Sequence, residues 1–459
     1  MLKKSSTPQI GFVGFGEVNT PREFIDDRCH RAAEELRKRG LVVVETAPVS
    51  DDPDGLQAQR AIDELAQADF DALVLCVAGW IPSWAVMKIV EQFRHKPILL
   101  WGLSGWRANG HFVTTADQAG TTALRAALAE HGCTFKYLVN FKDSAPRYDE
   151  AATYLKAAIT AAWMRHAFIG MNGYRDMRLF GTLYDGNLLK RVVGAEIEHF
   201  DLLEIEALVK EIPAAEIDAA AAHIRQEWEF LREPQAGTVE NSVRLALAFK
   251  RKIEERGYDA FSFCDVDGVK KLLKFAPAGA MTLLHDLVDL PTTPENDSYG
   301  TVTQLIVKSL TGKTPAYMEF YEFTCDSALM GVPDYVPGCA VDGKITVMPN
   351  AFGSFGEGLL NVSKVRTGEV TISRLAQVGG KLVLHVAHGT AVRPETWEEA
   401  GWAPPAPQLP SIEVKFDFPA DDFLAKVMGQ HYIVAYGDIR PLLQAYCDIA
   451  GITFIPGEK

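Results

Sequence analysis

The sequence lacks the features that mark several large classes of protein. Its seven cysteines are odd in number and never form a C-x-x-C pair, which favours reduced thiols in the cytoplasm over a disulfide framework. Its 46 Lys and Arg residues are outnumbered by 60 Asp and Glu, giving a formal net charge of −14. This balance argues against a nucleic-acid partner or an anionic membrane surface, because both require a clustered basic face.

Long apolar segments are also missing. The most apolar helical stretch, AAITAAWMRHAFIGM, is interrupted by Arg165 and His166, so we predict no membrane span. The first residues contain no apolar core of the length that a signal peptide requires, and none is expected.

The residues that are present predict an α/β protein of more than one domain. A chain of 459 residues is too long for one ordinary core. Segments typical of strands alternate with segments typical of helices from QIGFVGF to TFKYLVNF, which favours a doubly wound parallel sheet. We assign residues 1–170 to a Rossmann-like domain, and we expect the stretch DEAATYLKAAITAAWMRHAFIGMN to be a helix that leads out of it.

The remainder predicts two further domains. Residues 171–312 are expected to form a second α/β domain, with strands around FSFCDV and MTLLHDLVDL. After Gly312, short alternating segments such as AYMEFYEF and EVTISRLAQVGGKLVLHVAHG, separated by Gly and Pro, are typical of antiparallel strands. Residues 313–459 are therefore predicted to be a mostly antiparallel β domain.

A partial dinucleotide-binding pattern opens the chain. Gly14 and Gly16 follow the first predicted strand, and Glu45 ends the second. The third glycine position of the fingerprint holds Asn19, and the acid lies rather far from the glycines. An NAD-linked oxidoreductase is thus one hypothesis, and a glycine-rich tight turn without a cofactor is the other interpretation.

Two carboxylates directly precede a predicted apolar helix in PENDSYGTVTQLIVKSLTG. Asp297 is well placed to cap that helix, and Gly312 is its expected end. Capping leaves Glu295 without a role. Further on, Glu319 lies in the strand AYMEFYEF, and His431 begins an extended segment after Gly429. Two carboxylates and one imidazole would suit a divalent ion such as Mn²⁺ with positions open to substrate oxygens. Alone, each residue has a structural explanation.

These motifs together resemble the L-fucose/L-arabinose isomerase family, and the L-fucose isomerase branch most. The similarity lies in ENDSYG before a helix that ends SLTG, in AYMEFYEF, in GQHYIVAYGD, and in NGYRDMRLFGTLYDGNLLKRVVGAEIEHFDLLEI. The resemblance implies a Mn²⁺-dependent aldose–ketose isomerase that works through an enediol and assembles as a homo-oligomer. It implies that Glu295, Glu319 and His431 bind the metal ion and that the two glutamates carry protons.

The substrate side is less constrained. Arg175 and Arg178 flank Met177 in a predicted loop, where they could bind sugar hydroxyls or an anionic group, or be solvated. Trp106 and Arg107 follow the fourth predicted strand, at the edge where α/β sheets bind ligands, although a subunit contact would explain the tryptophan equally well. The arabinose branch has a further metal histidine that this chain lacks, so a non-catalytic sugar-binding protein is a third hypothesis. The sugar itself, neutral or anionic, is not identified by the sequence.

Overall fold

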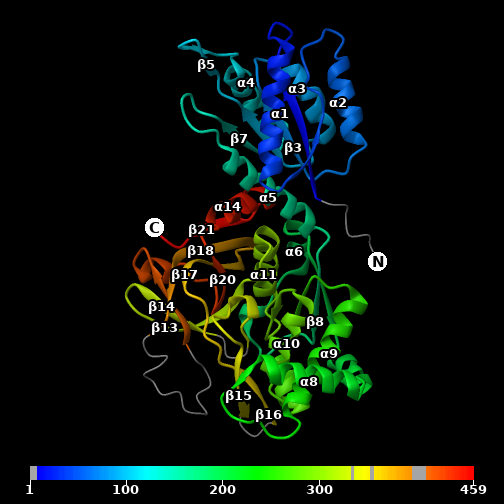
Figure 1. The fold of residues 1–459 in the computed structure, drawn as a ribbon, viewed down its shortest axis with the longest axis vertical. Coiled ribbons are helices and arrows are strands. Elements are labelled where there is room, and N and C mark those ends of the chain that lie inside the picture. The colour runs from blue at the N-terminus through cyan, green and yellow to red at the C-terminus, as the bar shows by residue number, and fades with distance from the viewer. Residues whose placement is uncertain (1–7, 332–334, 352–355, 395–409) are drawn as a thin grey trace. The chain divides into compact units, whose positions relative to one another are not determined.

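The computed structural model describes residues 8–331, 335–351, 356–394 and 410–459 (Figure 1). The chain forms two compact units, one containing residues 2–163 and 444–450 and the other containing residues 164–443 and 451–459. We call them the N-terminal unit and the C-terminal unit. The α/β class, with parallel sheets first and an antiparallel β region after them, is confirmed. The predicted boundaries near residues 170 and 312 stay predictions.

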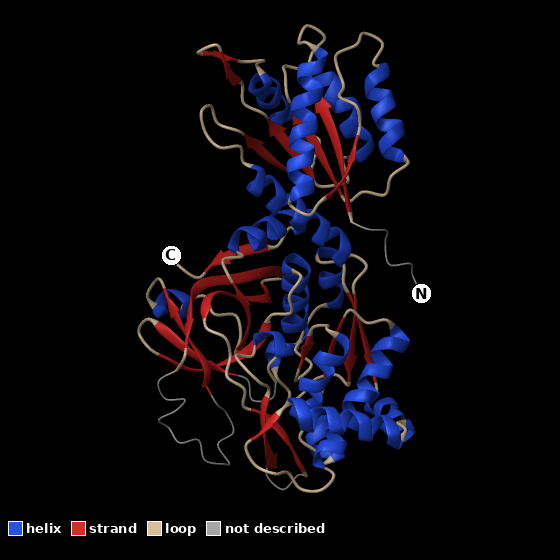
Figure 2. Ribbon diagram, viewed as in Figure 1, coloured by secondary structure: helices blue, strands red, loops and turns tan. Residues whose placement is uncertain are grey.

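The N-terminal unit is built on a five-stranded parallel sheet with strand order β2-β1-β3-β4-β7 and helices on its faces (Figure 2). Its central strands are apolar on both faces because both are covered, as expected for a doubly wound sheet. The elements are β1 (Gln9–Phe15), α1 (Arg22–Lys38), β2 (Val42–Glu45), α2 (Leu56–Ala66), β3 (Ala72–Val77), α3 (Ser83–Phe93), β4 (Ile98–Gly102), β5 (Trp106–Ala108), β6 (His111–Val113), α4 (Asp117–Glu130), β7 (Phe135–Val139) and α5 (Tyr148–Met164).

The glycines of the partial fingerprint have a packing role in this unit. A Cβ on Gly14 would collide with Cys29, and one on Gly16 would collide with Ile25, both on α1. The two glycines therefore let α1 approach the end of β1 closely. Glu45 is hydrogen-bonded to the same helix, since Nη2 of Arg37 donates to Oε2 of Glu45 at 2.9 Å. Helix packing thus accounts for these residues without a dinucleotide.

One buried acid makes the stability of this unit depend on pH. Asp117 begins α4, is 2% exposed, and its Oδ2 has no hydrogen-bond partner among the described residues. Burial raises the pKa of Asp117 from 3.8 to about 7, although the charge of Arg28 opposes the shift. The carboxyl is protonated in the folded chain and ionised in the unfolded chain between these two values. Stability is therefore lost as the pH rises from about 4 to 7.

We accordingly expect Asp117→Asn to stabilise the protein at pH 8 and to have little effect at pH 4. A shift of about three pKa units corresponds to an upper bound of about 4 kcal/mol, so a gain of about 2–4 kcal/mol is expected. Urea unfolding at the two pH values measures it. Asp63→Asn, on the exposed face of α2, serves as the control and should show no such difference. Equal effects of Asp117→Asn at both pH values would contradict the prediction.

The C-terminal unit begins with a four-stranded parallel sheet, order β12-β11-β8-β9. Two sequence predictions are wrong here. The helix that leads out of the first domain ends at Met164, and the following FIGMN is the inner strand β8. MTLLHDLVDL lies in helix α10, because its apolar residues pack on both sides in the core and periodicity cannot separate a buried helix from a buried strand. The elements are β8 (Phe168–Asn172), α6 (Gly186–Val192), β9 (Glu196–Phe200), α7 (Leu202–Glu211), α8 (Ala214–Glu227), β10 (Glu229–Phe230), α9 (Thr238–Arg256), β11 (Ala260–Phe263), α10 (Ala278–Val288), β12 (Thr292–Thr293) and α11 (Ser298–Thr311), with a π-helix at Asp265–Leu273.

The other strands of this unit pair antiparallel, apart from β21 on β18 and β10 on β15. Six strands follow the order β17-β20-β13-β14-β19-β18, and pairing of β17 with β18 closes them into a ring, with β21 added in parallel on β18. A separate small sheet contains β10, β15 and β16. The remaining elements of the chain are β13 (Ala316–Phe323), β14 (Ser327–Gly331), β15 (Thr346–Ala351), β16 (Glu357–Asn361), β17 (Gly368–Val378), β18 (Lys381–Val392), β19 (Pro410–Phe416), α13 (Ala420–Leu424), β20 (His431–Tyr436), α14 (Arg440–Ala450) and β21 (Thr453–Pro456), and residues 444–450 of α14 belong to the N-terminal unit.

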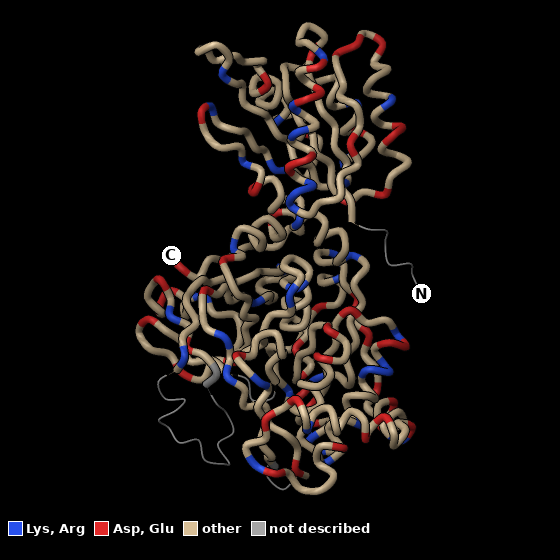
Figure 3. The backbone as a smooth tube through the Cα atoms, in the orientation of Figure 1, with Lys and Arg blue, Asp and Glu red and all other residues tan. Residues whose placement is uncertain are grey.

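Charged residues of both signs occur throughout the described chain. Lys and Arg positions are interspersed with Asp and Glu along the described chain (Figure 3). No helix in the described residues combines the length and apolar character that crossing a membrane would require. All seven cysteines are free thiols.

Candidate functional site

The turn before α11 has an unusual backbone. Glu295 and Asn296 have φ values of 63° and 49°, in the left-handed region that side chains other than glycine rarely occupy. Such residues cost of order 1–3 kcal/mol each, and they persist only where the surroundings fix them. Here the amide of Asn296 donates to the Phe263 carbonyl at 3.2 Å, and its side-chain Nδ2 donates to the Asn172 carbonyl at 2.9 Å. The ends of β8 and β11 therefore hold the turn.

Glu295 is also fixed from the π-helix that follows β11. Its backbone N–H donates to Oδ1 of Asp265 at 3.0 Å, and Oδ2 of the same aspartate accepts from the Lys270 ammonium at 2.9 Å. Burial raises the pKa of Asp265, opposed by Lys270 and reinforced by the neighbouring Asp176. π-helices are rare and are found frequently at functional sites. This one places the buried Asp265 at the backbone of Glu295 and the buried Lys270 against Asp265.

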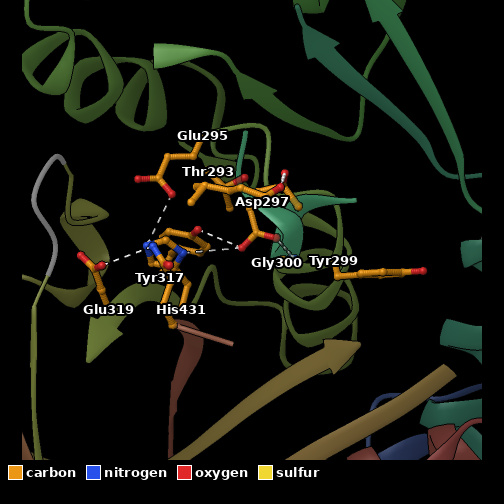
Figure 4. Close-up of polar contacts among 12 residues, drawn as sticks. Thr293, Glu295, Asp297, Tyr299, Gly300, Tyr317, Glu319 and His431 are labelled. Carbon is orange, nitrogen blue, oxygen red and sulfur yellow. Dashed lines mark hydrogen bonds and ion pairs between the residues drawn. The ribbon is translucent and has the colours of Figure 1, made fainter. Parts of the chain in front are cut away.

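Antiparallel pairing brings the other two predicted residues together. Strand β13 pairs with β20 so that Glu319 and His431 are direct Cα partners. Facing residues in such a pair have neighbouring Cβ atoms on the same side of the sheet. Figure 4 shows Glu295, Glu319 and His431 pointing toward one another from the turn before α11 and from these two strands.

Glu295 and His431 lie close to each other in this group. Nε2 of His431 lies 3.7 Å from Oε2 of Glu295, and both side chains are buried, at 4% and 6% residue exposure. This Nε2 has no hydrogen-bond partner among the described residues. Burial lowers the pKa of His431 to about 3, although the charge of Asp297 opposes this shift. The imidazole is therefore neutral at physiological pH, which is the form that binds metal ions.

Asp297 lies beside these residues and connects α11 to β17. It caps α11 by accepting the Gly300 amide at 3.0 Å, as the sequence predicts. It is also 1% exposed and forms a bidentate ion pair with the buried Arg374 of β17, with Nη2 to Oδ1 at 2.8 Å. Burial alone would raise the pKa of Asp297, but Arg374 outweighs it and lowers that pKa from its ordinary value.

The same carboxylate is connected to the histidine through a tyrosine. The Tyr317 hydroxyl donates to Oδ2 of Asp297 at 2.9 Å, and its ring stacks on the His431 ring with centroids 4.6 Å apart. Nδ1 of His431 lies 3.9 Å from Oδ2 of Asp297. The ion pair, the tyrosine and the strand pairing together fix the histidine so that Nε2 faces Glu295.

The donor set fits a divalent ion in part. Two atoms that each bind one ion at about 2.1 Å lie about 3.0–3.5 Å apart, so Glu295 and His431 need to move by only a few tenths of an ångström. Glu319 is half-buried, and its Oε1 accepts from Nε2 of Gln430 at 3.3 Å. No group of three or more His, Cys, Asp and Glu side chains in the described part of the chain already has the geometry to hold a metal ion. A three-ligand site thus requires the Glu319 carboxylate to turn.

The two predicted arginines lie in the same unit, on the loop after β8. Arg178 is exposed and left-handed, with φ of 56°, and its carbonyl accepts from the Arg175 guanidinium. Arg175 stacks on Phe180, with its guanidinium carbon 4.5 Å from the ring centroid. The loop adjoins the site, because the Gly181 carbonyl accepts from Nη2 of Arg374 at 3.1 Å. Arg175 thus supports the loop, and Arg178 keeps its side chain toward solvent.

Trp106 and Arg107 lie in the N-terminal unit. They belong to a small hairpin, where they line a cavity of that unit, and Arg107 pairs with Asp143 through two hydrogen bonds of 2.8 and 2.7 Å. Sequence reasoning missed Arg374, Asp265 and Lys270 altogether. Arg374 carried a usable signal, since it is the one charged residue inside the apolar segment VTISRLAQV.

Neither the protein-family models nor the curated proteins give a match to this chain.

Proposed function

We propose that this protein is a metal-dependent aldose–ketose isomerase, as the resemblance to the L-fucose/L-arabinose isomerases implies. The observation that carries the proposal is the convergence of Glu295, Glu319 and His431 from three elements, with a neutral imidazole aimed at a buried carboxylate (Figure 4). The imidazole Nε2 that faces this carboxylate has no hydrogen-bond partner among the described residues, and a buried polar atom without a partner is costly unless a ligand supplies one. Glu295, Glu319 and His431 would hold the ion, with Mn²⁺ the first choice for this mixed oxygen and nitrogen set.

The bound ion would polarise two adjacent substrate oxygens and acidify the intervening carbon-bound proton. The chain's own residues supply the proton transfers. One carboxylate takes the proton from one carbon, giving an enediol, and returns it to the neighbouring carbon. The other carboxylate can transfer a proton between the two substrate oxygens. Glu295 is buried and Glu319 half-buried, so their environments differ as an acid–base pair requires.

The rigid support fits this role. Proton transfer between adjacent carbons needs the base to be held within hydrogen-bond reach of both. Asp265 fixes the backbone of Glu295. The Asp297–Arg374 ion pair fixes Tyr317, and the Tyr317 ring in turn positions the His431 ring. Glu295 and Asn296 therefore adopt a strained left-handed backbone conformation, which keeps the Glu295 carboxylate in one place.

A screen tests the activity. The full chain is incubated with Mn²⁺ and a panel of aldoses, neutral and anionic, and ketose formation is followed. We expect at least one aldose to be converted, and removal of metal by a chelator to stop the conversion. Turnover that is unaffected by the chelator would overturn the metal-dependent mechanism. Failure with every aldose would favour the non-catalytic sugar-binding alternative.

The exposed guanidinium of Arg178 makes an anionic sugar part of the proposal. If the substrate carries a sulfonate, phosphate or carboxylate, Arg178→Ala should raise KM for it by the equivalent of about 2–3 kcal/mol. Metal affinity should not change. Arg244→Ala, which removes a partly exposed arginine from α9, is the matched control. An unchanged KM on an anionic substrate, or turnover of neutral sugars only, would contradict the assignment.

A homo-oligomer and a cytoplasmic location complete the proposal. The resemblance supports the first, and the seven free thiols support the second.

A further inference from the structure

A cavity of about 640 Å³ lies in the N-terminal unit, at the carboxyl ends of its parallel strands. The loops that follow β4 and β7 form two of its sides, and the first half of α1 and the start of α5 form the others. Parallel strands end at one edge of a sheet, which is where open α/β sheets bind ligands. The volume is within the range of small-molecule sites. The lining residues are Phe24, Asp27, Arg28, Arg31, Leu103, Ser104, Gly105, Trp106, Arg107, Phe112, Asn140, Phe141, Asp143, Ser144, Pro146 and Tyr148.

A short ordered hairpin forms one wall. Strands β5 and β6 are joined by Asn109 and Gly110, both with positive φ, as a two-residue type I′ turn requires. Gly105 permits close packing at the hairpin base, where a Cβ would meet the Val113 carbonyl. The two hydrogen bonds from Arg107 to Asp143 tie the hairpin to the loop after β7. The wall is therefore held at both ends.

Aromatic rings and cations face this cavity together. Trp106 stacks on Phe24 with centroids 4.1 Å apart, and the Arg28 guanidinium lies 5.1 Å from the Trp106 ring. Lys142 is not itself a lining residue, but it lies between the lining residues Phe141 and Asp143 on the loop after β7, and its ammonium lies 4.8 Å from the ring centroid of Phe112. The cavity thus combines flat apolar surfaces with positive charge.

The charge of this cavity is not balanced by its own acids. Arg31 pairs with Asp27, and Arg107 pairs with Asp143. Among the described residues Arg28 and Lys142 form no ion pair: Arg28 donates through Nη2 to the Ser104 carbonyl, and its Nε is buried without a partner. Asp117 acts on Arg28 at longer range. The lining contains three arginines and two aspartates, so it carries a net positive charge in a chain whose net charge is −14, and Lys142 beside it acts at longer range on Asp143.

We propose that this cavity binds the phosphate monoester of a sugar, either a sugar phosphate or a nucleotide, separately from the isomerase site. Arg28 and Lys142 hold the phosphate, since an arginine with free N–H groups forms strong charge-assisted hydrogen bonds to phosphate oxygens. The sugar or nucleoside lies against Trp106 and Phe112. All the lining residues belong to the N-terminal unit, whereas Glu295 and His431 belong to the C-terminal unit. The proposal therefore does not rest on the isomerase activity.

Isothermal titration of the full chain tests this site with four probes: glucose 6-phosphate, adenosine monophosphate, inorganic phosphate and glucose. We expect one of the two esters to bind at least tenfold more tightly than inorganic phosphate, and glucose not to bind. Whichever ester binds more tightly identifies the source as a sugar phosphate or a nucleotide. Arg28→Gln and Lys142→Ala should each raise that Kd at least tenfold. Arg125→Gln, which removes an exposed charge from α4 outside the cavity, should leave it unchanged.

Two further results separate this site from the metal site and from a folding defect. Glu295→Gln should bind the ester with wild-type Kd, so a lost affinity there would overturn the separate site. Lys142 is exposed, so its variant remains informative even if Arg28→Gln is unstable. No ester binding at millimolar concentration, equal affinity for inorganic phosphate, or affinity unchanged in both cavity variants would each overturn the proposal.

Discussion

Glu295→Gln is expected to lower kcat for isomerisation by about a thousandfold or more with Mn²⁺ in excess. The substitution keeps the shape of the side chain and removes the charge that would hold the ion and accept the proton, and general acid–base catalysis alone is worth about 10²–10⁴-fold. Initial rates of ketose formation measure the effect, with the sugar found in the screen. Glu319→Gln should behave similarly.

The control for both variants is Glu322→Gln, an exposed carboxylate on the same strand as Glu319. It should retain wild-type kcat. The urea midpoint of Glu295→Gln should stay close to that of the wild type, because no core volume is lost. A Glu295 variant that keeps most of its activity would show that this carboxylate is a structural acid.

Arg374→Met should destabilise the protein by about 3–5 kcal/mol. The substitution leaves the Asp297 carboxylate buried without its cation, and breaking one side of a buried ion pair costs this much. The low pKa of Asp297 means that the contribution of the pair is complete at neutral pH and is lost as the pH falls below about 4. Urea unfolding at pH 7 measures the change, with Arg244→Met, at a partly exposed arginine of α9, as the control.

The double variant Asp297→Asn/Arg374→Met distinguishes an ion pair from a simple helix cap. It removes both charges, so it should be more stable than Arg374→Met alone. If Asp297 only capped α11, its loss would cost about 1 kcal/mol and the two substitutions would add. Additive effects of about that size would contradict the role of the pair in fixing His431.

Local signals predicted the elements that have strong local causes. Strand β1 has the predicted bounds, and α11 is capped by Asp297 and ends at Gly312, whose φ of 71° favours glycine. The same reasoning failed for segments that are buried on all sides. FIGMN continues an apolar helical run in the sequence, and α10 carries apolar residues all round, so their periodicity gave no warning.

The site shows the same division. The motifs selected Glu295, Glu319 and His431, but their convergence depends on the β13–β20 register and on a closed sheet that no local pattern specifies. Arg374 lies 77 residues from Asp297, and Asp265, which binds the backbone of Glu295 from a π-helix, lies 30 residues from it. Partners this distant are fixed by tertiary packing, which is why the sequence assigned Asp297 only its cap.

Metal content tests the central claim most directly. The full chain is equilibrated with Mn²⁺, freed of unbound ion by dialysis, and analysed for metal beside Glu295→Gln and Glu322→Gln. We expect about one ion per chain in the wild type and in Glu322→Gln, and close to none in Glu295→Gln. A wild-type chain that retains no more ion than Glu295→Gln would contradict the proposed metal site.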